Sequence, residues 1–336
     1  MLRRVGIVLV AAALVVAVAG GLTAWFGWRY LNDYMQTAGP SETGRVVTVP
    51  RGEGVAAIAS RLAEAGVIAD ERLFTLGVRL SQRDRELKAG EYAFPAAITP
   101  LAVLDLLESG RTVQRRVTVA EGAQVREVMA ALEAAEGLTG PLPDPPPQGS
   151  LLPETYFFEN GETRAAMLAR MQKAMTDALA ELWPQRAENL PFDTPEQAVV
   201  LASIVEKETG VAAERPQVAS VFVNRLRRGM PLQSDPTVIF ALTGGEADLG
   251  RPLLRADLQV DHPVNTYVVN GLPPTPIANP GRASLEAVLN PAETDFLYFV
   301  ADGTGGHAFA RTLAEHNRNV ARWRAVQRGQ SGPTGG

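Results

Sequence analysis

The 336-residue chain contains no cysteine, so disulfides, thiolate metal sites and cysteine nucleophiles are excluded. Its only histidines are His262, His307 and His316. They are too few for a histidine-rich metal site, although two of them with one carboxylate would still make a ligand set. The chain also lacks a basic surplus, because 32 Lys and Arg stand against 37 Asp and Glu, a net charge of −5. We therefore expect no metal, no other cofactor and no nucleic-acid partner.

Several familiar catalytic motifs are missing as well. The sequence has no P-loop, HExxH or GxSxG string, and Ser203 and Lys207 are spaced by four, not by the three of S-x-x-K. Residues 303–306 are Gly-rich, but they lie between two strand-like segments and predict a hairpin turn. Hydrophobic residues make up 46% and charged residues 21%, which indicates a globular chain of roughly two domains.

One long apolar run occurs at the N-terminus. Val5–Trp28 contains 24 residues without a charge, and about 20 apolar residues suffice to span a bilayer core. Arg3 and Arg4 precede the run. This charge bias predicts that residues 1–4 are cytoplasmic and that the chain after Arg29 lies outside the cytoplasm.

A cleaved signal peptide is the alternative, because residues 17–19 form an A-x-A site. The apolar run continues nine residues past that site, which is longer than a signal sequence needs. We therefore favour an uncleaved transmembrane helix over 5–28. It predicts a single-pass membrane protein whose main part lies outside the cytoplasm.

A repeat with an offset of 70 residues follows a predicted linker, 29–45. Each copy predicts a strand, a glycine turn and an amphipathic helix. Two unrelated β-α units are the alternative, but seven matches at one offset favour a repeat. The matched pairs are Val47 and Val117, Thr48 and Thr118, Val49 and Val119, Gly52 and Gly122, Val55 and Val125, Ile58 and Val128, and Leu62 and Leu132.

The first copy continues as a small α+β unit, predicted over 46–110. Its further elements are a helix near 71–81, a turn into a strand at 88–94 and a helix at 99–109. The β-α-α-β order resembles LysM, a carbohydrate-binding module, although a rigid spacer would have the same order.

A larger α+β domain is predicted over 111–330. Residues 137–153 are rich in Pro and Gly, which indicates a boundary or a long surface loop. Residues 331–336 have the composition of a disordered tail.

The larger domain contains a well-marked apolar helix. Thr194 is a typical N-cap, Pro195 suits the first helical position, and Gln197 completes a capping box. Gly210 is expected to end the helix in a left-handed conformation. The residues between are nearly all apolar, so the helix is predicted to be buried.

Glu208 is the candidate catalytic residue of this helix. It lies seven residues beyond Leu201 and so shares the apolar stripe. Burial and the negative helix terminus both raise the pKa of such a carboxyl, as a general acid requires. Glu206 lies about 140° from Leu201 and cannot pair with Glu208. A salt bridge from Glu208 to an arginine of the next helix is the alternative.

The residues after this helix suit a sugar ligand. A second helix is predicted over 214–228, and its end places Asn224 and Arg225 where a cleft would be. Amide, hydroxyl and carboxylate groups with an aromatic ring suit sugar hydroxyls and N-acetyl groups, although ordinary loops contain them too. The candidate substrate-binding residues are Asn224, Gln233, Ser234, Asp235, Thr237, Asn265, Tyr267 and His307.

Four strings resemble the YceG-like family. They are LASIVEKETG, ERPQVASVFVNRLRRGMPLQSDPTVIF, NTYVVNGLPPTPIANPGRASLEAVLNP and YFVADGTGGHAF. Weaker similarity extends through VTVPRGEGV, LKAGEYAF and LLESG. The resemblance implies an inner-membrane lyase that cuts peptidoglycan strands internally, with a LysM-like subdomain near 46–96. It also implies that Glu208, the second Glu of E-K-E-T, is catalytic. The loop 137–153 diverges from the family.

The resemblance further implies a lytic transglycosylase that acts on nascent strands during cell-wall assembly. One glutamate would act as acid and then as base, and the product would carry a 1,6-anhydroMurNAc end. Peptidoglycan synthases are implied as further partners. A muramidase-type hydrolase using Asp235 as second carboxylate is one alternative, and a non-catalytic glycan-binding scaffold is another.

Overall fold

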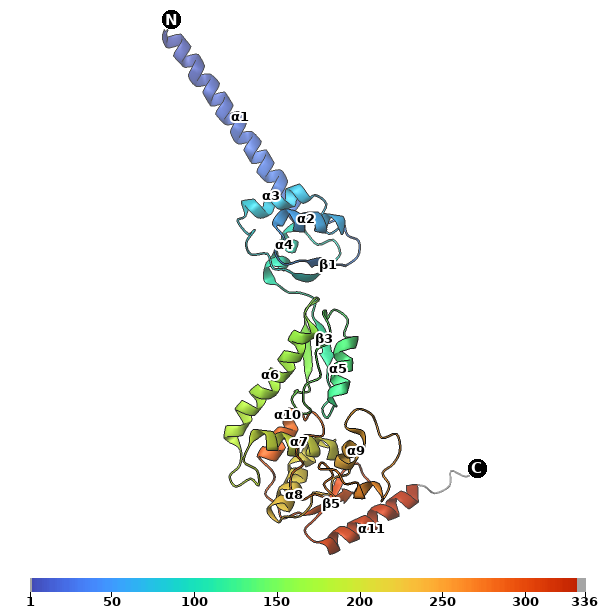
Figure 1. Ribbon diagram of the computed structural model, residues 1–336. Helices are drawn as coiled ribbons and strands as arrows, with labels where there is room; N and C mark the ends of the chain where they lie inside the picture. Colours follow the sequence, from blue (N-terminus) through green and yellow to red (C-terminus); the bar gives the residue numbers. More distant parts are fainter. Residues whose placement is uncertain (1, 331–336) are drawn as a thin grey trace, which may run out of the picture. The chain divides into compact units, whose positions relative to one another are not determined.

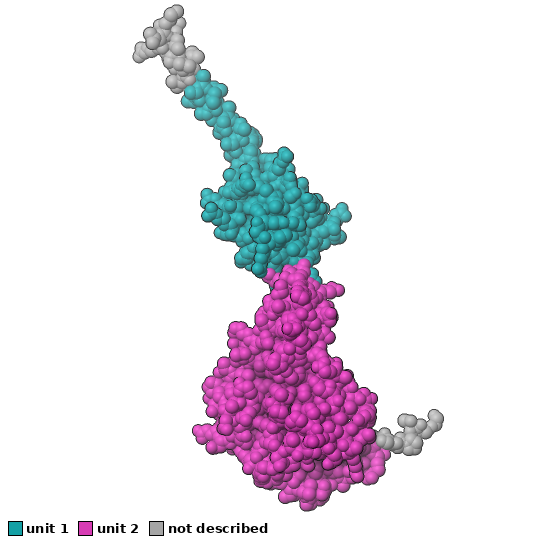
Figure 2. Space-filling model, viewed as in Figure 1, with its two compact units in different colours: residues 1–115 teal, residues 116–336 magenta. Residues whose placement is uncertain are grey.

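The computed structural model describes residues 2–330, so the predicted tail 331–336 lies outside the described residues. The chain divides into two compact units, Met1–Arg115 and Arg116–Gly336 (Figure 2). Each unit contains helices and strands, and the predicted α+β class is therefore confirmed.

Helix α1 extends over Leu2–Gln36 and is longer than the predicted span. Its segment Ala12–Gln36 is long and apolar enough for a membrane span or a signal sequence. The predicted linker 29–45 is wrong in its first part, because the helix continues to Gln36. The physical reason is that Leu31 and Met35 are buried in the hydrophobic core of the first unit.

The first unit has the β-α-α-β order expected from the sequence, followed by a helix. Its strands β1 and β2 pair antiparallel, with Val47 opposite Tyr92. Phe74 and Tyr92 are fully buried between this sheet and the helices. The elements after α1 are β1 (Arg45–Val49), α2 (Val55–Glu64), α3 (Glu71–Leu80), β2 (Gly90–Phe94) and α4 (Pro100–Ser109).

The second unit is larger and mainly helical around two short sheets, β3–β4 and β5–β6. Helices α7, α8 and α10 pack against one another in its core (Figure 1). Strands β5 and β6 form the hairpin predicted around 303–306. The elements are β3 (Arg115–Thr118), α5 (Val125–Ala134), β4 (Thr155–Phe158), α6 (Arg164–Leu182), α7 (Pro195–Glu208), α8 (Arg215–Arg227), α9 (Asp235–Thr243), α10 (Arg282–Leu289), β5 (Tyr298–Ala301), β6 (His307–Ala310) and α11 (Leu313–Gln330). Short 3₁₀ turns occupy Trp183–Gln185, Ala212–Glu214 and Asp257–Gln259.

The two copies of the repeat have the same local structure. In each copy a strand leads to a glycine with positive φ, 84° at Gly52 and 75° at Gly122, and a ten-residue helix follows. A left-handed turn of this kind favours glycine because it has no Cβ. Except for Val55, which is partly buried, the matched apolar residues are buried in both copies, as the pairs Val49 and Val119 and Leu62 and Leu132 show.

The Pro- and Gly-rich segment 137–153 forms no helix or strand, as expected. Only part of it is a surface loop, because Leu151 and Leu152 are buried. The side-chain oxygen of Asn279 accepts hydrogen bonds from the backbone N–H groups of Gly149 and Leu151, at 3.1 and 3.2 Å. The end of the segment is therefore fixed inside the second unit.

Gly149 gives a direct test of this packing. It has φ of 81°, and a Cβ at this position would lie 2.6 Å from Pro276 Cγ. We expect Gly149→Ala to lower the free energy of unfolding by about 3 kcal/mol, from backbone strain and overpacking together. Gly161 is the matched control, since it has φ of 92° and nothing within 4 Å of its Cβ position. Equal losses for Gly149→Ala and Gly161→Ala in urea unfolding would contradict the close packing.

Candidate active site

Helix α7 begins as the sequence predicts. The side chain of Thr194 accepts a hydrogen bond from the backbone N–H of Gln197, and the Gln197 side chain accepts one from the backbone N–H of Thr194. Leu201, Ile204 and Val205 are fully buried, so the helix lies in the core of the second unit. This burial fixes the direction in which the last residues of α7 point.

The end of α7 differs from the prediction. Gly210 does not have a positive φ, so the expected left-handed cap is wrong. Thr209 instead leaves the helix in an extended conformation, with φ of −141°, and its hydroxyl accepts a hydrogen bond from the backbone N–H of Val211. Because Thr209 already turns the chain, no left-handed residue is needed. Glu208 is therefore the last residue of the helix.

The two glutamates of α7 have different surroundings. Glu206 is buried, forms an ion pair with Arg215 of α8 at 3.2 Å and accepts a hydrogen bond from the backbone N–H of Gly281. The salt bridge considered for Glu208 is thus made by Glu206. Among the residues that the structure describes, Glu208 has no ion pair. Its side chain instead lines a cleft.

The cleft has a volume of about 270 Å³, and its lining is mainly polar. Burial raises the pKa of Glu208 to about 7. The hydrogen bond from Ser234 and electrostatic interactions with His307 and Arg225 lower this pKa, whereas the charge of Asp235 raises it. The lining residues are Glu208, Phe222, Arg225, Leu232, Gln233, Asp235, Tyr267, Phe299 and His316. The cleft therefore contains a carboxyl that exchanges its proton near neutral pH.

Ser234 contacts Glu208 directly. Its hydroxyl donates to Oε1 of Glu208 at 2.5 Å, and the serine is itself buried. Its backbone N–H donates to the hydroxyl of Thr266 at 3.0 Å, and the hydroxyl of Thr237 donates to its carbonyl at 2.6 Å. Gln233, just before it, has φ of 54°, a strained conformation for a residue other than glycine. These contacts hold the serine in position against Glu208.

Three of the predicted substrate residues share the cleft with Glu208. They are Gln233, Asp235 and Tyr267. The Tyr267 hydroxyl donates to Oδ1 of Asp235 at 2.6 Å, so this carboxylate already has a partner. Burial and the neighbouring Asp235 raise the pKa of Tyr267, which stays protonated near neutral pH.

The other predicted residues lie outside the cleft lining. Asn224 donates to the carbonyls of Thr294 and Phe296, and Asn265 donates to those of Leu258 and Val260. Thr237 is fully buried beside Ser234. The amides of Asn224 and Asn265 thus donate hydrogen bonds to backbone carbonyls that need a partner when they are buried. His307 is held by Glu214, with 2.7 Å between Nδ1 and Oε2.

Five cleft residues were not among the candidate substrate-binding residues, although Arg225 was expected beside a cleft. Arg225 is buried, and its guanidinium donates to the carbonyls of Leu297 and Leu232 at 2.7 and 2.8 Å. It thereby ties the segment before Gln233 to β5. Its place at the end of the predicted second helix was the only sequence signal. The other four are Phe222, Leu232, Phe299 and His316.

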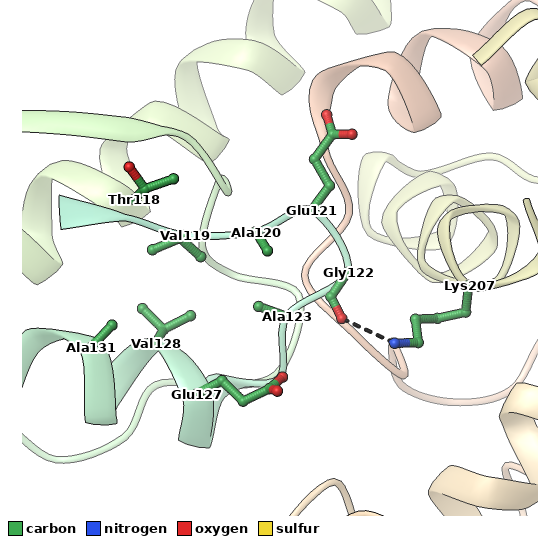
Figure 3. Close-up of a pocket in the computed structure, with 10 residues that line it drawn as sticks. All are labelled: Thr118, Val119, Ala120, Glu121, Gly122, Ala123, Glu127, Val128, Ala131 and Lys207. Carbon is green, nitrogen blue, oxygen red and sulfur yellow. Dashed lines mark hydrogen bonds between the residues drawn. The ribbon is translucent and has the colours of Figure 1, made fainter. Parts of the chain in front are cut away.

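A second hollow, of about 290 Å³, lies at the glycine turn of the second repeat (Figure 3). Lys207 is one of its lining residues and donates to the carbonyl of Gly122 at 3.4 Å. The two carboxylates that line this hollow have partners, because Glu121 pairs with Arg215 and Glu127 caps the start of α5. Among the described residues that line this hollow, each acid–base side chain therefore already has a partner. Within residues 12–328 no cluster of three or more potential ligands could hold a metal ion.

The fold and the site define an α+β protein with a single desolvated carboxyl in a polar cleft. The sequence profile of the YceG-like family matches residues 47–322, and the chain belongs to this family.

Named relatives cover most of the chain. An endolytic murein transglycosylase of Bacillus subtilis (strain 168) is 33% identical over 309 residues, which are 83% of this chain and 84% of the relative. An endolytic murein transglycosylase of Streptococcus pneumoniae (strain D39) is 28% identical over 90% of this chain and 62% of its own length. A crystal structure of a YceG-like protein from Listeria monocytogenes aligns with a TM-score of 0.50 and 29% identity, over 83% of this chain and 99% of that one.

The burial of Glu208 predicts a pH-dependent loss of stability. Its pKa of about 7 in the folded protein exceeds the ordinary 4.5, so the folded state binds the proton more tightly. The free energy of unfolding is therefore unaffected by Glu208 below pH 4.5, and it falls as the pH rises from 4.5 through about 7. We expect Glu208→Gln to raise the free energy of unfolding at pH 8 by about 2 kcal/mol.

Glu206→Gln is the matched control two residues earlier. It weakens a buried ion pair and should lower the free energy of unfolding by about 2 kcal/mol, since Arg215 keeps only Glu121. Urea unfolding at pH 5 and pH 8 measures both. A Glu208→Gln protein no more stable than the wild type at pH 8 would show that Glu208 is not desolvated.

Proposed function

We propose that this chain is an endolytic lytic transglycosylase, a lyase that cleaves MurNAc–GlcNAc bonds inside peptidoglycan strands. The observation that carries the proposal is Glu208 with its pKa of about 7 in a polar cleft, without an ion-pair partner among the described residues. Two relatives are named for this activity. The family and the chemistry of the cleft therefore support the same reaction.

In the proposed reaction Glu208 acts twice. The protonated carboxyl first donates its proton to the glycosidic oxygen, and the bond from that oxygen to C1 of MurNAc breaks. The C6 hydroxyl of the same sugar then attacks C1, and the Glu208 carboxylate accepts the hydroxyl proton. No water is consumed, and Glu208 ends protonated as it began.

The environment of Glu208 suits both steps. A group that alternates between acid and base works best when its pKa is close to the operating pH. Burial alone favours the neutral acid, and the hydrogen bond from Ser234 favours the carboxylate. The intramolecular nucleophile is already in place, so a second carboxylate is not required to activate water.

The proposal extends to location and partners. Helix α1 would anchor the chain in the inner membrane with a cytoplasmic N-terminus, and the second unit would act on nascent strands in the periplasm. The first unit would serve as a LysM-like subdomain, and peptidoglycan synthases would be further partners.

The decisive experiment is mass spectrometry of fragments released from purified peptidoglycan. The proposal predicts products that are lighter by one water than hydrolytic ones. It also predicts that Glu208→Gln lowers their formation by about 10³-fold or more. Reducing ends would indicate a muramidase-type hydrolase, and binding without any product would indicate a glycan-binding scaffold.

Asp235→Asn separates the lyase from the hydrolase. A hydrolase that uses Asp235 to activate water would lose nearly all activity. A lyase would keep its anhydro products, with a loss of about tenfold from the altered contact with Tyr267. Initial rates of fragment release measure the difference. Complete inactivation by this substitution would count against the single-carboxyl mechanism.

Ser234→Ala tests how the pKa of Glu208 is set. It removes the hydrogen bond that stabilises the carboxylate, so the pKa of Glu208 should rise by about one unit above its value in the wild type. Because the first step needs protonated Glu208, the decline of kcat/KM at high pH should move upward by the same amount. Ser220→Ala, another buried serine without contact to Glu208, should leave the profile unchanged.

A further inference from the structure

Helix α1 is joined to the first unit by packing. Leu31 and Met35 belong to the core of that unit. The Tyr34 hydroxyl donates to the carbonyl of Asp70, which caps α3, at 2.8 Å. A Cβ at Gly77 of α3 would lie 2.7 Å from the sulfur of Met35, so the two helices approach closely. The end of α1 therefore lies against α3, and the core fixes its direction.

Exposed leucines occur on the helices that contact α1. In the described part of the first unit, four large hydrophobic residues outside α1 are exposed: Val46, Leu76, Leu80 and Leu101. Leu76 and Leu80 lie on α3 and Leu101 on α4, and these are the two helices that pack against α1. Leu76 and Leu80 are four residues apart and therefore share one face of α3, and exposed apolar residues on one face indicate an interaction surface.

Two arginines lie on the same side of α3 as Leu76. Arg72 and Arg79 are seven residues apart and line, together with Leu76, a groove of about 630 Å³ between α2 and α3. Among the described residues neither forms an ion pair, whereas Arg83, just after the helix, pairs with Glu108. Glu71 lines the same groove, so the groove has a net charge of +1, and both guanidinium groups are available to anions.

Distance along α1 places this surface close to the end of the apolar run. Trp28 precedes Met35 by seven residues, which correspond to about 10 Å of helical rise. Leucines at that depth would reach the boundary between headgroups and acyl chains, and arginines would meet lipid phosphates.

We propose that Leu76, Leu80 and Leu101, with Arg72 and Arg79, form a membrane-contact face that rests on an anionic lipid bilayer beside α1. This step depends on the anchor role of α1 in the proposed function. The face would hold the first unit at a defined height and tilt above the bilayer, instead of leaving it free to swing about the anchor.

The absence of cysteine allows a clean test with single-cysteine variants of the full chain. Leu76→Cys, Leu101→Cys and Val46→Cys are each labelled with a fluorophore in nanodiscs that contain phosphatidylglycerol and lipids with a quencher near the headgroup. Val16→Cys, near the middle of the predicted span, is labelled in matched nanodiscs whose quencher is on the acyl chains. We expect the labels at Leu76 and Leu101 to be quenched several-fold more than the label at Val46, an exposed residue of β1. Val16, within α1, reports on insertion of the anchor.

The outcomes separate this proposal from the proposed function. Quenching at Leu76 and Leu101 no stronger than at Val46, with Val16 quenched, would overturn the membrane-contact face and leave the anchor intact. An unquenched Val16 would overturn both. Assaying anhydro products on the same samples reports on the cleavage reaction separately.

The arginines have their own test. The double substitution Arg72→Glu and Arg79→Glu should lower the ratio of docked to undocked first unit by about tenfold on anionic lipid. The decrease in quenching of the label at Leu76 measures this change. Arg45→Glu combined with Arg51→Glu reverses two exposed charges elsewhere in the unit and should leave that quenching unchanged. Equal effects of the two pairs would overturn the role given to Arg72 and Arg79.

Discussion

Glu208 lies at the point where a helix buried on nearly every side opens into a polar cleft, and the cost of charging its carboxyl there governs the site. The core positions of α7 fix where the side chain points, because Leu201, Ile204 and Val205 cannot move without opening the core. Burial holds the proton on Glu208, and one hydrogen bond from Ser234 opposes it. A carboxyl balanced in this way can give and take a proton near neutral pH, which a one-residue acid–base mechanism requires.

Contacts around Glu208 hold the neighbouring residues that set its pKa in fixed positions. Arg225 binds the backbone carbonyls of Leu232 and Leu297 and so fixes the chain before Gln233. Gln233 stays in its strained left-handed conformation because its neighbours are held on both sides. Two arginines of α8 thus serve the site through different contacts, since Arg215 neutralises Glu206 and leaves Glu208 as the uncompensated carboxyl.

Local patterns predicted the features that depend on near neighbours in sequence. The start of α7, the glycine turns at Gly52 and Gly122 and the hairpin before His307 follow from capping and turn chemistry. The position of Glu208 on the buried stripe of α7 followed from helical spacing alone.

Features that depend on distant partners could not be predicted in the same way. The length of α1 is set by burial of Leu31 and Met35 against segments much later in the chain. The sequence made Asn265 a candidate sugar-binding residue, but its amide donates hydrogen bonds to carbonyls of its own loop. Phe299 and His316 reach the cleft from the last strands and helix, and nothing in their local sequence indicates it.

The protonation of Glu208 can be measured directly by ¹³C NMR titration of the glutamate carboxyl resonances. The Glu208→Gln protein identifies the resonance that belongs to Glu208. The structure predicts that this resonance titrates with a pKa of about 7. A midpoint near the ordinary 4.5 would contradict the account, because Glu208 would then be ionised at neutral pH and unable to act as the acid.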